Sequence, residues 1–253
     1  MTRNSITNHP NAPDIESSTA DYAMRFSGKI GEWFLDVQNH ASKTLINGKA
    51  LRVLDVGGGH GQNIQTIHSL GHTLTILGSN DECGHRIQSD ITLGKVQFNT
   101  GSFLSLPYAD RSFDVVITYR TLSHMDNWEA FIEELCRVSS HSVIIDYPEK
   151  FSFNVFSNFL FFLKKYVEKN TRRYLCFNQR QIDDAFSLHG FTHQARYKQF
   201  LLPMAAHRML RMKTLSVFGE GLFRALGLTP LFGSPVVSCF AITSRSDKNL
   251  EVE

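Results

Sequence analysis

The chain lacks the features that mark extracellular, membrane-spanning and nucleic-acid-binding proteins. Its four cysteines are scattered and form no C-x-x-C pair, which argues against a disulfide framework or a zinc site and is typical of reduced, buried thiols. The formal net charge is only +2, so no global excess of basic residues favours a nucleic-acid partner. No apolar run is long enough to span a bilayer, and the polar N-terminus lacks the apolar region of a secretory signal. These absences predict a cytoplasmic protein with no metal site.

What the chain does contain is a concentration of glycine after a short apolar run. Residues 51–54 are mostly apolar and β-prone, and Asp55 and Val56 lead into glycines at positions 57, 58, 59 and 61. Apolar side chains then recur at positions 64, 67 and 70, which is helical spacing. A strand that turns through glycines into a helix lets a ligand approach the backbone closely and offers it unpaired N–H groups. This stretch therefore predicts a nucleotide-type binding loop.

The spacing of the glycines distinguishes between ligands. Positions 57, 59 and 61 form G-x-G-x-G, whereas a dinucleotide site needs G-x-G-x-x-G. Counted from Gly57 or from Gly58, a position that must be glycine is occupied by Gln62 or His60. The spacing therefore disfavours a nicotinamide-dependent oxidoreductase. A glycine-rich turn without a ligand is the remaining alternative, but four glycines in five residues cost backbone entropy that a bare turn does not require.

Apolar periodicity predicts an α/β fold. Apolar runs alternate with amphipathic segments, which is typical of right-handed crossovers in a doubly wound parallel sheet. The predicted strands are 51–54, 73–78, 96–98, 112–118, 142–147, 191–200 and 235–243, and the predicted helices are 63–70, 81–89, 128–138, 179–186 and two within 204–226. Ligands of such sheets bind beyond the carboxyl ends of the strands.

Composition and apolar patterning also predict how the chain is divided into tails and a domain. Residues 1–20 are expected to be a flexible tail, 21–246 a single domain, and 247–253 a second tail. Within the domain we expect N-terminal helices over 21–49, a ligand-binding core over 50–148, an aromatic and basic cap over 151–175, and a helical insertion over 201–234. The cap and the insertion combine apolar and basic residues, which favours either a roof over an apolar substrate or contact with a membrane surface. Plain packing on the sheet is the alternative.

Several short motifs occur in a fixed order around the glycine loop. They are 53–61, Leu106-Pro107-Tyr108 with Ser112-Phe113-Asp114-Val115-Val116, then Leu122-Ser123-His124, then Arg137-Val138. In these motifs the chain resembles the class I, Rossmann-like S-adenosylmethionine-dependent methyltransferases, in particular the family that includes the ubiquinone and menaquinone biosynthesis enzymes. The resemblance implies a seven-stranded sheet of order 3-2-1-4-5-7-6 with strand 7 antiparallel. It also implies S-adenosylmethionine as cofactor and methylation of a small, apolar or amphiphilic acceptor at oxygen or carbon.

The resemblance also assigns cofactor-binding positions. It places the cofactor against the glycine loop, with Asp55 ordering that loop. The acids that bind ribose and adenine in the family align with Asn80 and Ser102, so both positions have lost their charge here. Asp81 is a nearby substitute for the first acid. The full expected set is Asp55, Gly57, Gly58, Gly59, Gly61, Asn80, Asp81, Ser102, Phe103, Thr118 and Tyr119.

Residues after the fourth strand are candidates for the chemistry. His124 is the best-placed general base, since its unperturbed pKa lies near 6.5, and Tyr119 is a second catalytic candidate. Arg120, His124 and Tyr147 are the expected acceptor contacts. His124 has two structural alternatives, capping the next helix or packing under the cofactor. The uncharged Asn80 and Ser102 leave open a second reading, a catalytically inactive binding module of the same fold.

Overall fold

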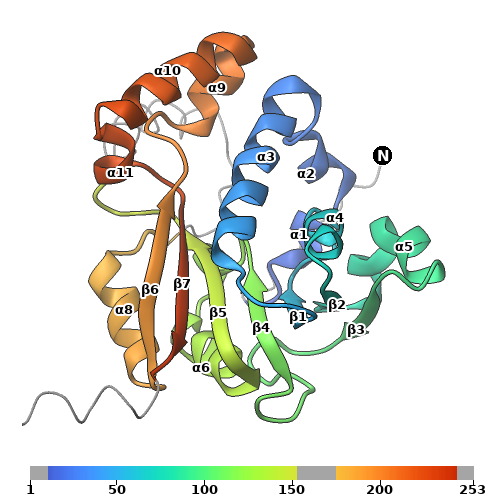
Figure 1. The fold of residues 1–253 in the computed structure, drawn as a ribbon. Coiled ribbons are helices and arrows are strands. Elements are labelled where there is room, and N and C mark those ends of the chain that lie inside the picture. Colours follow the sequence, from blue (N-terminus) through green and yellow to red (C-terminus); the bar gives the residue numbers. More distant parts are fainter. Residues whose placement is uncertain (1–10, 153–174, 244–253) are drawn as a thin grey trace, which may run out of the picture.

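A seven-stranded sheet forms the centre of the molecule (Figure 1), which a computed structural model describes over residues 11–152 and 175–243. The strand order is β3-β2-β1-β4-β5-β7-β6, and β7 runs antiparallel to β5 and β6. The strands are β1 (Arg52–Val56), β2 (Thr73–Gly78), β3 (Gln97–Thr100), β4 (Phe113–Thr118), β5 (Ser139–Tyr147), β6 (Phe191–Lys198) and β7 (Val236–Ile242). The predicted fold class, strand order and antiparallel seventh strand are therefore confirmed.

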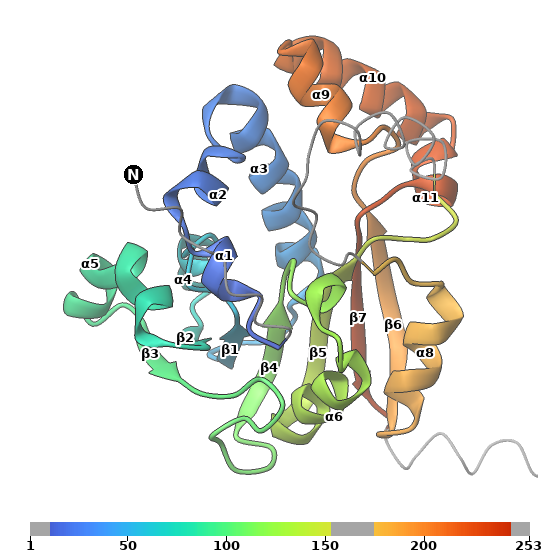
Figure 2. The same cartoon turned by 180° about the vertical axis from the view of Figure 1, so that it is seen from behind.

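Helices cover both faces of the sheet, as Figure 2 shows from behind. One face packs on α6 and α8, and the other packs on α3 and α4. The helices are α1 (Asp14–Ser17), α2 (Ala20–Met24), α3 (Gly28–Leu45), α4 (Ile64–Ser69), α5 (Gln88–Thr92), α6 (Trp128–Val138), α8 (Gln179–Ser187), α9 (Met204–Leu210), α10 (Lys213–Ala225) and α11 (Leu228–Phe232). Two 3-10 helices, η1 (Asp81–Ile87) and η2 (Leu122–His124), follow β2 and β4.

The central strands are buried on both faces, which explains their nearly continuous apolar sequence. In β1, Val53 packs into the cluster under α3 and α4, and Leu54 packs into the cluster under α6 and α8. Asp55 pairs in register with Ile76 of β2 and Ile117 of β4. The loops that follow these three strands therefore emerge together at one edge of the sheet.

The connection between β6 and β7 carries three helices. The two expected within 204–226 are α9 and α10, and α11 is an additional short helix. Trp33 of α3 packs edge to face on His207 of α9, with ring centroids 5.1 Å apart. Glu220 of α10 accepts hydrogen bonds from the backbone N–H of Leu201 and from His207. The predicted aromatic and basic cap over 151–175 lies almost wholly outside the described residues.

The N-terminal segment differs from the expected flexible tail. Residues 1–10 lie outside the described part of the chain, but Asp14–Ser17 forms α1, and Asp14 is buried. The carboxylate of Asp14 accepts a hydrogen bond of 2.7 Å from the backbone N–H of Ser79, just after β2. The expectation of a tail over 1–20 is therefore wrong for residues 11–20. The segment is short and polar, and its order comes from tertiary contacts that local composition does not reveal.

No helix in the described part of the chain has both the length and the apolar character needed to cross a membrane.

Candidate functional site

The loop after β1 has a backbone that favours glycine. Gly57 has a φ of +81° and Gly61 a φ of +73°, in the left-handed region that side chains disfavour. The N–H of Gly57 donates to the carbonyl of Leu77 at 2.9 Å, and the N–H of Gly61 donates to the carbonyl of Gly58 at 2.8 Å. The loop is therefore a tight turn anchored to the end of β2.

Close approach explains the glycines between them. A Cβ at Gly58 would lie 2.2 Å from Oδ2 of Asp55, and a Cβ at Gly59 would lie 2.2 Å from the carbonyl oxygen of Cys83 in η1. Both distances are shorter than any real van der Waals contact. The glycine loop therefore passes in atomic contact between the Asp55 carboxyl and the start of η1.

Asp55 is buried under this loop. Its Oδ2 accepts from the side-chain amide of Asn63 at 2.8 Å, and Asn63 accepts in turn from Gln38 at 3.4 Å. Burial raises the pKa of Asp55 to about 6, against the opposing effects of the Asn63 hydrogen bond and the charge of Arg120. This series of hydrogen bonds, from Gln38 through Asn63 to Asp55, ties the glycine loop to α3. Sequence reasoning missed Asn63 and Gln38 because only the fold brings α3 to the loop.

Three further segments converge on Gly57. A Cβ at this position would lie 2.8 Å from Oγ1 of Thr121, 3.8 Å from Cβ of Asp14 and 3.8 Å from Cε2 of Phe103. These residues come from the loop after β4, from α1 and from the loop after β3. Phe103 is buried and stacks on Phe131 of α6, with ring centroids 5.8 Å apart. The ring edge of Phe103, and not an open face, therefore lies next to the glycine loop.

Arg120 connects the loop after β4 to β5, to Gln62 after the glycine loop and to Phe26 between α2 and α3. Its φ is +59°, and its backbone N–H donates to Oδ1 of Asp146 at 2.5 Å. Its guanidinium donates to the side chain of Gln62 and lies 4.4 Å from the centroid of the Phe26 ring. Burial raises the pKa of Asp146 to about 6, and the N–H and charge of Arg120 oppose that rise. The expected role of Arg120 as an acceptor contact stays a prediction, because its described contacts are with the protein itself.

Asp55 and Asp146 lead us to expect that the unliganded protein loses stability as the pH rises from about 4 to about 6. Each carboxyl has a pKa of about 6 when folded, against an ordinary value of 3.8, so in this window the folded protein keeps protons that the unfolded chain has released. Each group should lower the free energy of unfolding by up to about 3 kcal/mol and have no further effect above that window. Urea unfolding at several pH values measures this. An Asp55→Asn/Asp146→Asn variant should give a flatter profile, and an unchanged profile would contradict the assignment.

Three of the predicted site residues use their polar atoms within the fold. The hydroxyl of Tyr119 lies 2.7 Å from Oγ of Ser42 in α3, and burial raises its pKa, which opposes a role as a base. The hydroxyl of Tyr147 lies 3.5 Å from Oγ of Ser238. Thr118 donates to the carbonyl of Val56 at 2.8 Å. These contacts link the sheet to its neighbours and leave the cofactor and catalytic roles of the three residues as predictions.

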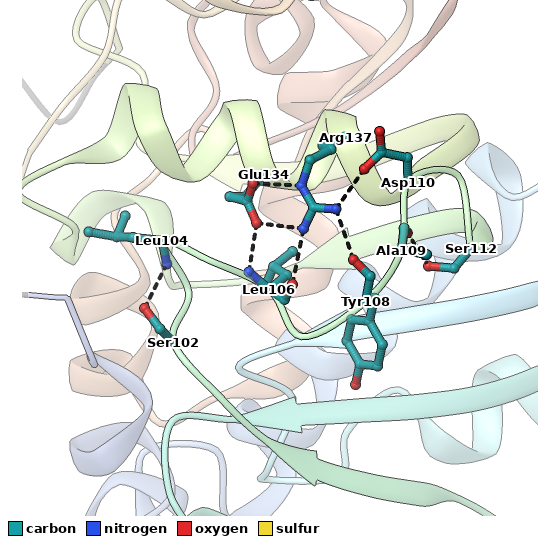
Figure 3. Close-up of polar contacts among 9 residues, drawn as sticks. All are labelled: Ser102, Leu104, Leu106, Tyr108, Ala109, Asp110, Ser112, Glu134 and Arg137. Carbon is teal, nitrogen blue, oxygen red and sulfur yellow. Dashed lines mark hydrogen bonds and ion pairs between the residues drawn. The ribbon is translucent and has the colours of Figure 1, made fainter.

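Two residues at the positions of the missing acids make local turns. Oδ1 of Asn80 accepts from the backbone N–H of Cys83 at 3.2 Å and so caps η1. Oγ of Ser102 accepts from the N–H of Leu104 at 3.2 Å, as Figure 3 shows. Asp81 is exposed and faces an open groove of about 420 Å³ beside the edge strand β3. That groove includes no other predicted cofactor residue, so the candidate site remains the glycine loop.

A polar cluster on α6 holds the loop between β3 and β4 (Figure 3). Arg137 donates to the carbonyls of Leu106 and Tyr108 at 3.0 and 2.8 Å, and to Glu134 at 2.7 and 2.8 Å. Glu134 accepts from the N–H of Leu106 at 2.6 Å, and the hydrogen bonds from Arg137 lower its pKa. The cluster explains why the Leu-Pro-Tyr motif occurs together with Arg137. It fixes the loop that brings Phe103 to Gly57.

His124 ends η2 and is half-buried, and its N–H donates to the carbonyl of Thr121 at 3.0 Å. It therefore lies on the same short loop that brings Thr121 to the glycines. No group of three or more potential metal ligands is found among the described residues.

A family profile described as a methyltransferase domain matches residues 54–145. The match contains the glycine loop, the Arg137 cluster and His124. Together with the fold, it confirms the predicted class I methyltransferase domain and indicates S-adenosylmethionine as its cofactor. Membership of the ubiquinone and menaquinone subfamily is not confirmed.

Curated relatives match shorter stretches. Norajmaline N-methyltransferase of Rauvolfia serpentina is 39% identical over 59 residues, which are 22% of this chain and 20% of that protein. An O-methyltransferase of Aspergillus nomiae is 29% identical over 132 residues, 50% of this chain and 53% of that protein. This chain thus spans about half, or less, of the length of these relatives.

Solved structures share the fold at low identity. Magnesium protoporphyrin IX methyltransferase from Synechocystis PCC 6803, solved with bound SAH, has a TM-score of 0.62 at 13% identity, over 90% of this chain and 97% of that one. A [4+2]-cyclase has a TM-score of 0.54 at 16% identity, over 83% of this chain and 80% of that one. Both similarities concern the fold alone.

Proposed function

We propose that this protein transfers the methyl group of S-adenosylmethionine to a small, apolar or amphiphilic acceptor, at an oxygen or carbon atom. The observation that carries the proposal is the glycine loop, packed on the buried Asp55 inside the matched methyltransferase domain. The loop lies beyond the carboxyl ends of parallel strands, where ligands of such folds bind. Glycine at positions 57, 58, 59 and 61 means that no side chain of the loop itself would stand between its backbone and a ligand.

The cofactor would supply a methyl group already activated by a sulfonium leaving group. The work left to this chain is to hold donor and acceptor in line and to keep water out, and orientation alone supplies on the order of 7–11 kcal/mol. The Arg120 contacts with Gln62, Asp146 and Phe26 tie the segments around the loop into one unit. Such a connected unit is suited to holding the cofactor and the acceptor in a fixed orientation.

An exposed apolar face supports an apolar or amphiphilic acceptor. Leu215, Phe218 and Leu222 follow helical spacing on α10, and all three are exposed, Phe218 by 71%. Arg211 and Lys213 lie at the start of this helix. Peripheral membrane contact is a second use of the same face. Co-sedimentation with anionic liposomes separates the two uses, because a face that only admits a small acceptor leaves the protein in the supernatant.

His124 is proposed as the base for an acceptor that enters protonated, since its loop reaches the glycines. We expect the protein to bind S-adenosylhomocysteine in isothermal titration, and mass spectrometry with labelled S-adenosylmethionine to detect a methylated product in a panel of phenols and quinols. His124→Ala should then lower kcat by about 10²–10⁴-fold without changing that affinity. His189→Ala, an exposed histidine beyond α8, is the matched control. An absence of binding at millimolar ligand would sink the proposed activity, and unchanged turnover in His124→Ala would remove only the base.

A binding module of the same fold is the competing function. The uncharged Asn80 and Ser102, both used in local turns, support it. Tight binding of S-adenosylhomocysteine without transfer to any acceptor in the panel would favour this alternative.

A further inference from the structure

The N-terminal helix α1 contacts the glycine-loop end of the sheet. It packs against η1, and its Asp14 is only 1% exposed. Oδ2 of Asp14 accepts from the backbone N–H of Ser79 at 2.7 Å. Ser79 is the first residue after β2. A carboxylate from the start of the chain is thus fixed at the carboxyl end of the second strand.

Besides Oδ1 of Asn11, two buried polar atoms of this segment have no hydrogen-bond partner among the described residues. They are Oδ1 of Asp14 and Oγ of Ser18, and Ser18 is 9% exposed. Four residues separate the two side chains, which is the spacing of one helical face. Leaving a buried carboxylate oxygen without a donor is unfavourable, so such an atom calls for an explanation. A ligand that donates hydrogen bonds provides one.

Both atoms belong to side chains that face the glycine loop. Cβ of Asp14 lies 3.8 Å from the position that a Cβ of Gly57 would take, and Oγ of Ser18 lies 3.1 Å from the corresponding position at Gly59. The unpartnered acceptors therefore lie beside the glycine loop, whose Gly57, Gly58 and Gly59 are themselves buried. The other carboxylate oxygen without a hydrogen-bond partner in the described part of the chain is Oε2 of Glu149, which lies 3.6 Å from Nζ of Lys198.

The residues that follow β2 supply no free carboxylate to this surface. Oδ1 of Asn80 is occupied by the N–H and the thiol of Cys83, at 3.2 and 3.3 Å. Asp81 is exposed and faces the groove beside β3. The position at which the resemblance implies a ribose-binding acid is thus occupied by Asn80, which caps η1, and Asp14 places a carboxylate on the neighbouring Ser79.

We propose that Asp14 accepts hydrogen bonds from the ribose hydroxyls of the cofactor, so that α1 is part of the cofactor site. This inference rests on the proposed function. A ribose diol offers two donors, and Oδ2 of Asp14 stays on Ser79 while Oδ1 has no hydrogen-bond partner by geometry. The Cys83 thiol also interacts with this carboxylate, but it is a weak donor that a hydroxyl can displace. Binding then holds the N-terminal segment more firmly against the sheet, since the ligand joins α1 to the glycine loop.

Asp14→Asn tests the assignment by isothermal titration with two probes, S-adenosylhomocysteine and 5′-methylthioadenosine. The second probe keeps the ribose and lacks the amino-acid part. Asparagine can keep the bond to Ser79 but loses the charge, so both affinities should fall by about tenfold. Asp184→Asn, which removes an exposed carboxylate from α8, is the charge-matched control and should leave both affinities unchanged.

Each other pattern overturns the assignment in a recognisable way. Wild-type affinity in Asp14→Asn for both probes removes Asp14 from the site. A loss for S-adenosylhomocysteine alone assigns Asp14 to the ammonium group of the ligand. A loss seen in Asp81→Asn and not in Asp14→Asn returns the role to Asp81. Failure of the wild-type chain to bind either probe contradicts the proposed function itself, and not Asp14 in particular.

Hydrogen exchange on the full wild-type chain tests the same proposal without a variant. Addition of S-adenosylhomocysteine should slow amide exchange in residues 11–24 as well as in the glycine loop. Protection of the loop with unchanged exchange in residues 11–24 would show that α1 takes no part in binding.

Discussion

Replacing Gly59 with alanine should weaken binding of S-adenosylhomocysteine by ten- to a hundredfold and lower the free energy of unfolding by about 1–3 kcal/mol. The added Cβ would lie 2.2 Å from the carbonyl oxygen of Cys83, a backbone atom that no rotamer change can move. It would also lie 3.1 Å from Oγ of Ser18. Either η1 or the N-terminal segment must therefore shift, and both border the candidate cofactor site.

Gly219→Ala is the matched control, because no atom lies within 4 Å of the position that its Cβ would take on α10. That variant should bind normally and should gain up to about 1 kcal/mol, since alanine favours a helix over glycine. Titration calorimetry and urea unfolding measure the two quantities. If Gly59→Ala bound the ligand as tightly as the wild type, the loop would not be the cofactor site.

Replacing Arg137 with alanine should cost about 3 kcal/mol of stability. The guanidinium donates to the carbonyls of Leu106 and Tyr108 and to both oxygens of Glu134, so its loss removes a donor from each of them. The Leu106 carbonyl and Oε2 of Glu134 keep a backbone N–H. The cost should stay at the lower end of the 3–5 kcal/mol known for fully buried pairs, because Arg137 is 29% exposed. Arg137→Lys should recover only part of it, since an ammonium cannot reach all of these acceptors at once.

Urea unfolding measures the loss, with Arg180→Ala on the exposed surface of α8 as the control. The control should change stability by less than about 0.5 kcal/mol. Arg137→Ala should also weaken cofactor binding, because the released loop carries Phe103 to Gly57. A stability loss below about 1 kcal/mol would mean that the loop holds its position without the cluster.

Elements with strong apolar periodicity are predictable from this sequence. The ranges of β2 and α6 agree with the predicted 73–78 and 128–138, because a single apolar pattern fills each element. Short elements were harder to predict from the sequence. The helix α11 contains Pro230, which disfavours a helix locally but is tolerated in a first turn.

The candidate site likewise has features that the sequence predicts and features that it does not. The glycine spacing predicts the loop, since its backbone requirement depends on neighbouring residues alone. Side-chain direction at the strand ends was not predictable. Tyr119 follows β4 as directly as the loop residues do, yet its hydroxyl reaches Ser42 of α3, 77 positions away in sequence.

By itself, the sequence determined the α/β class and the tight glycine turn, because these follow from patterns within short stretches. The methyltransferase domain followed from the resemblance of its ordered motifs. Only the tertiary structure decided which side chains meet at that loop. Asp14 lies 65 positions from Ser79, and the carboxylate of one reaches the N–H of the other only after the whole sheet has formed. Contacts of that kind depend on how distant segments pack against one another, and a local pattern of residues does not predict that packing.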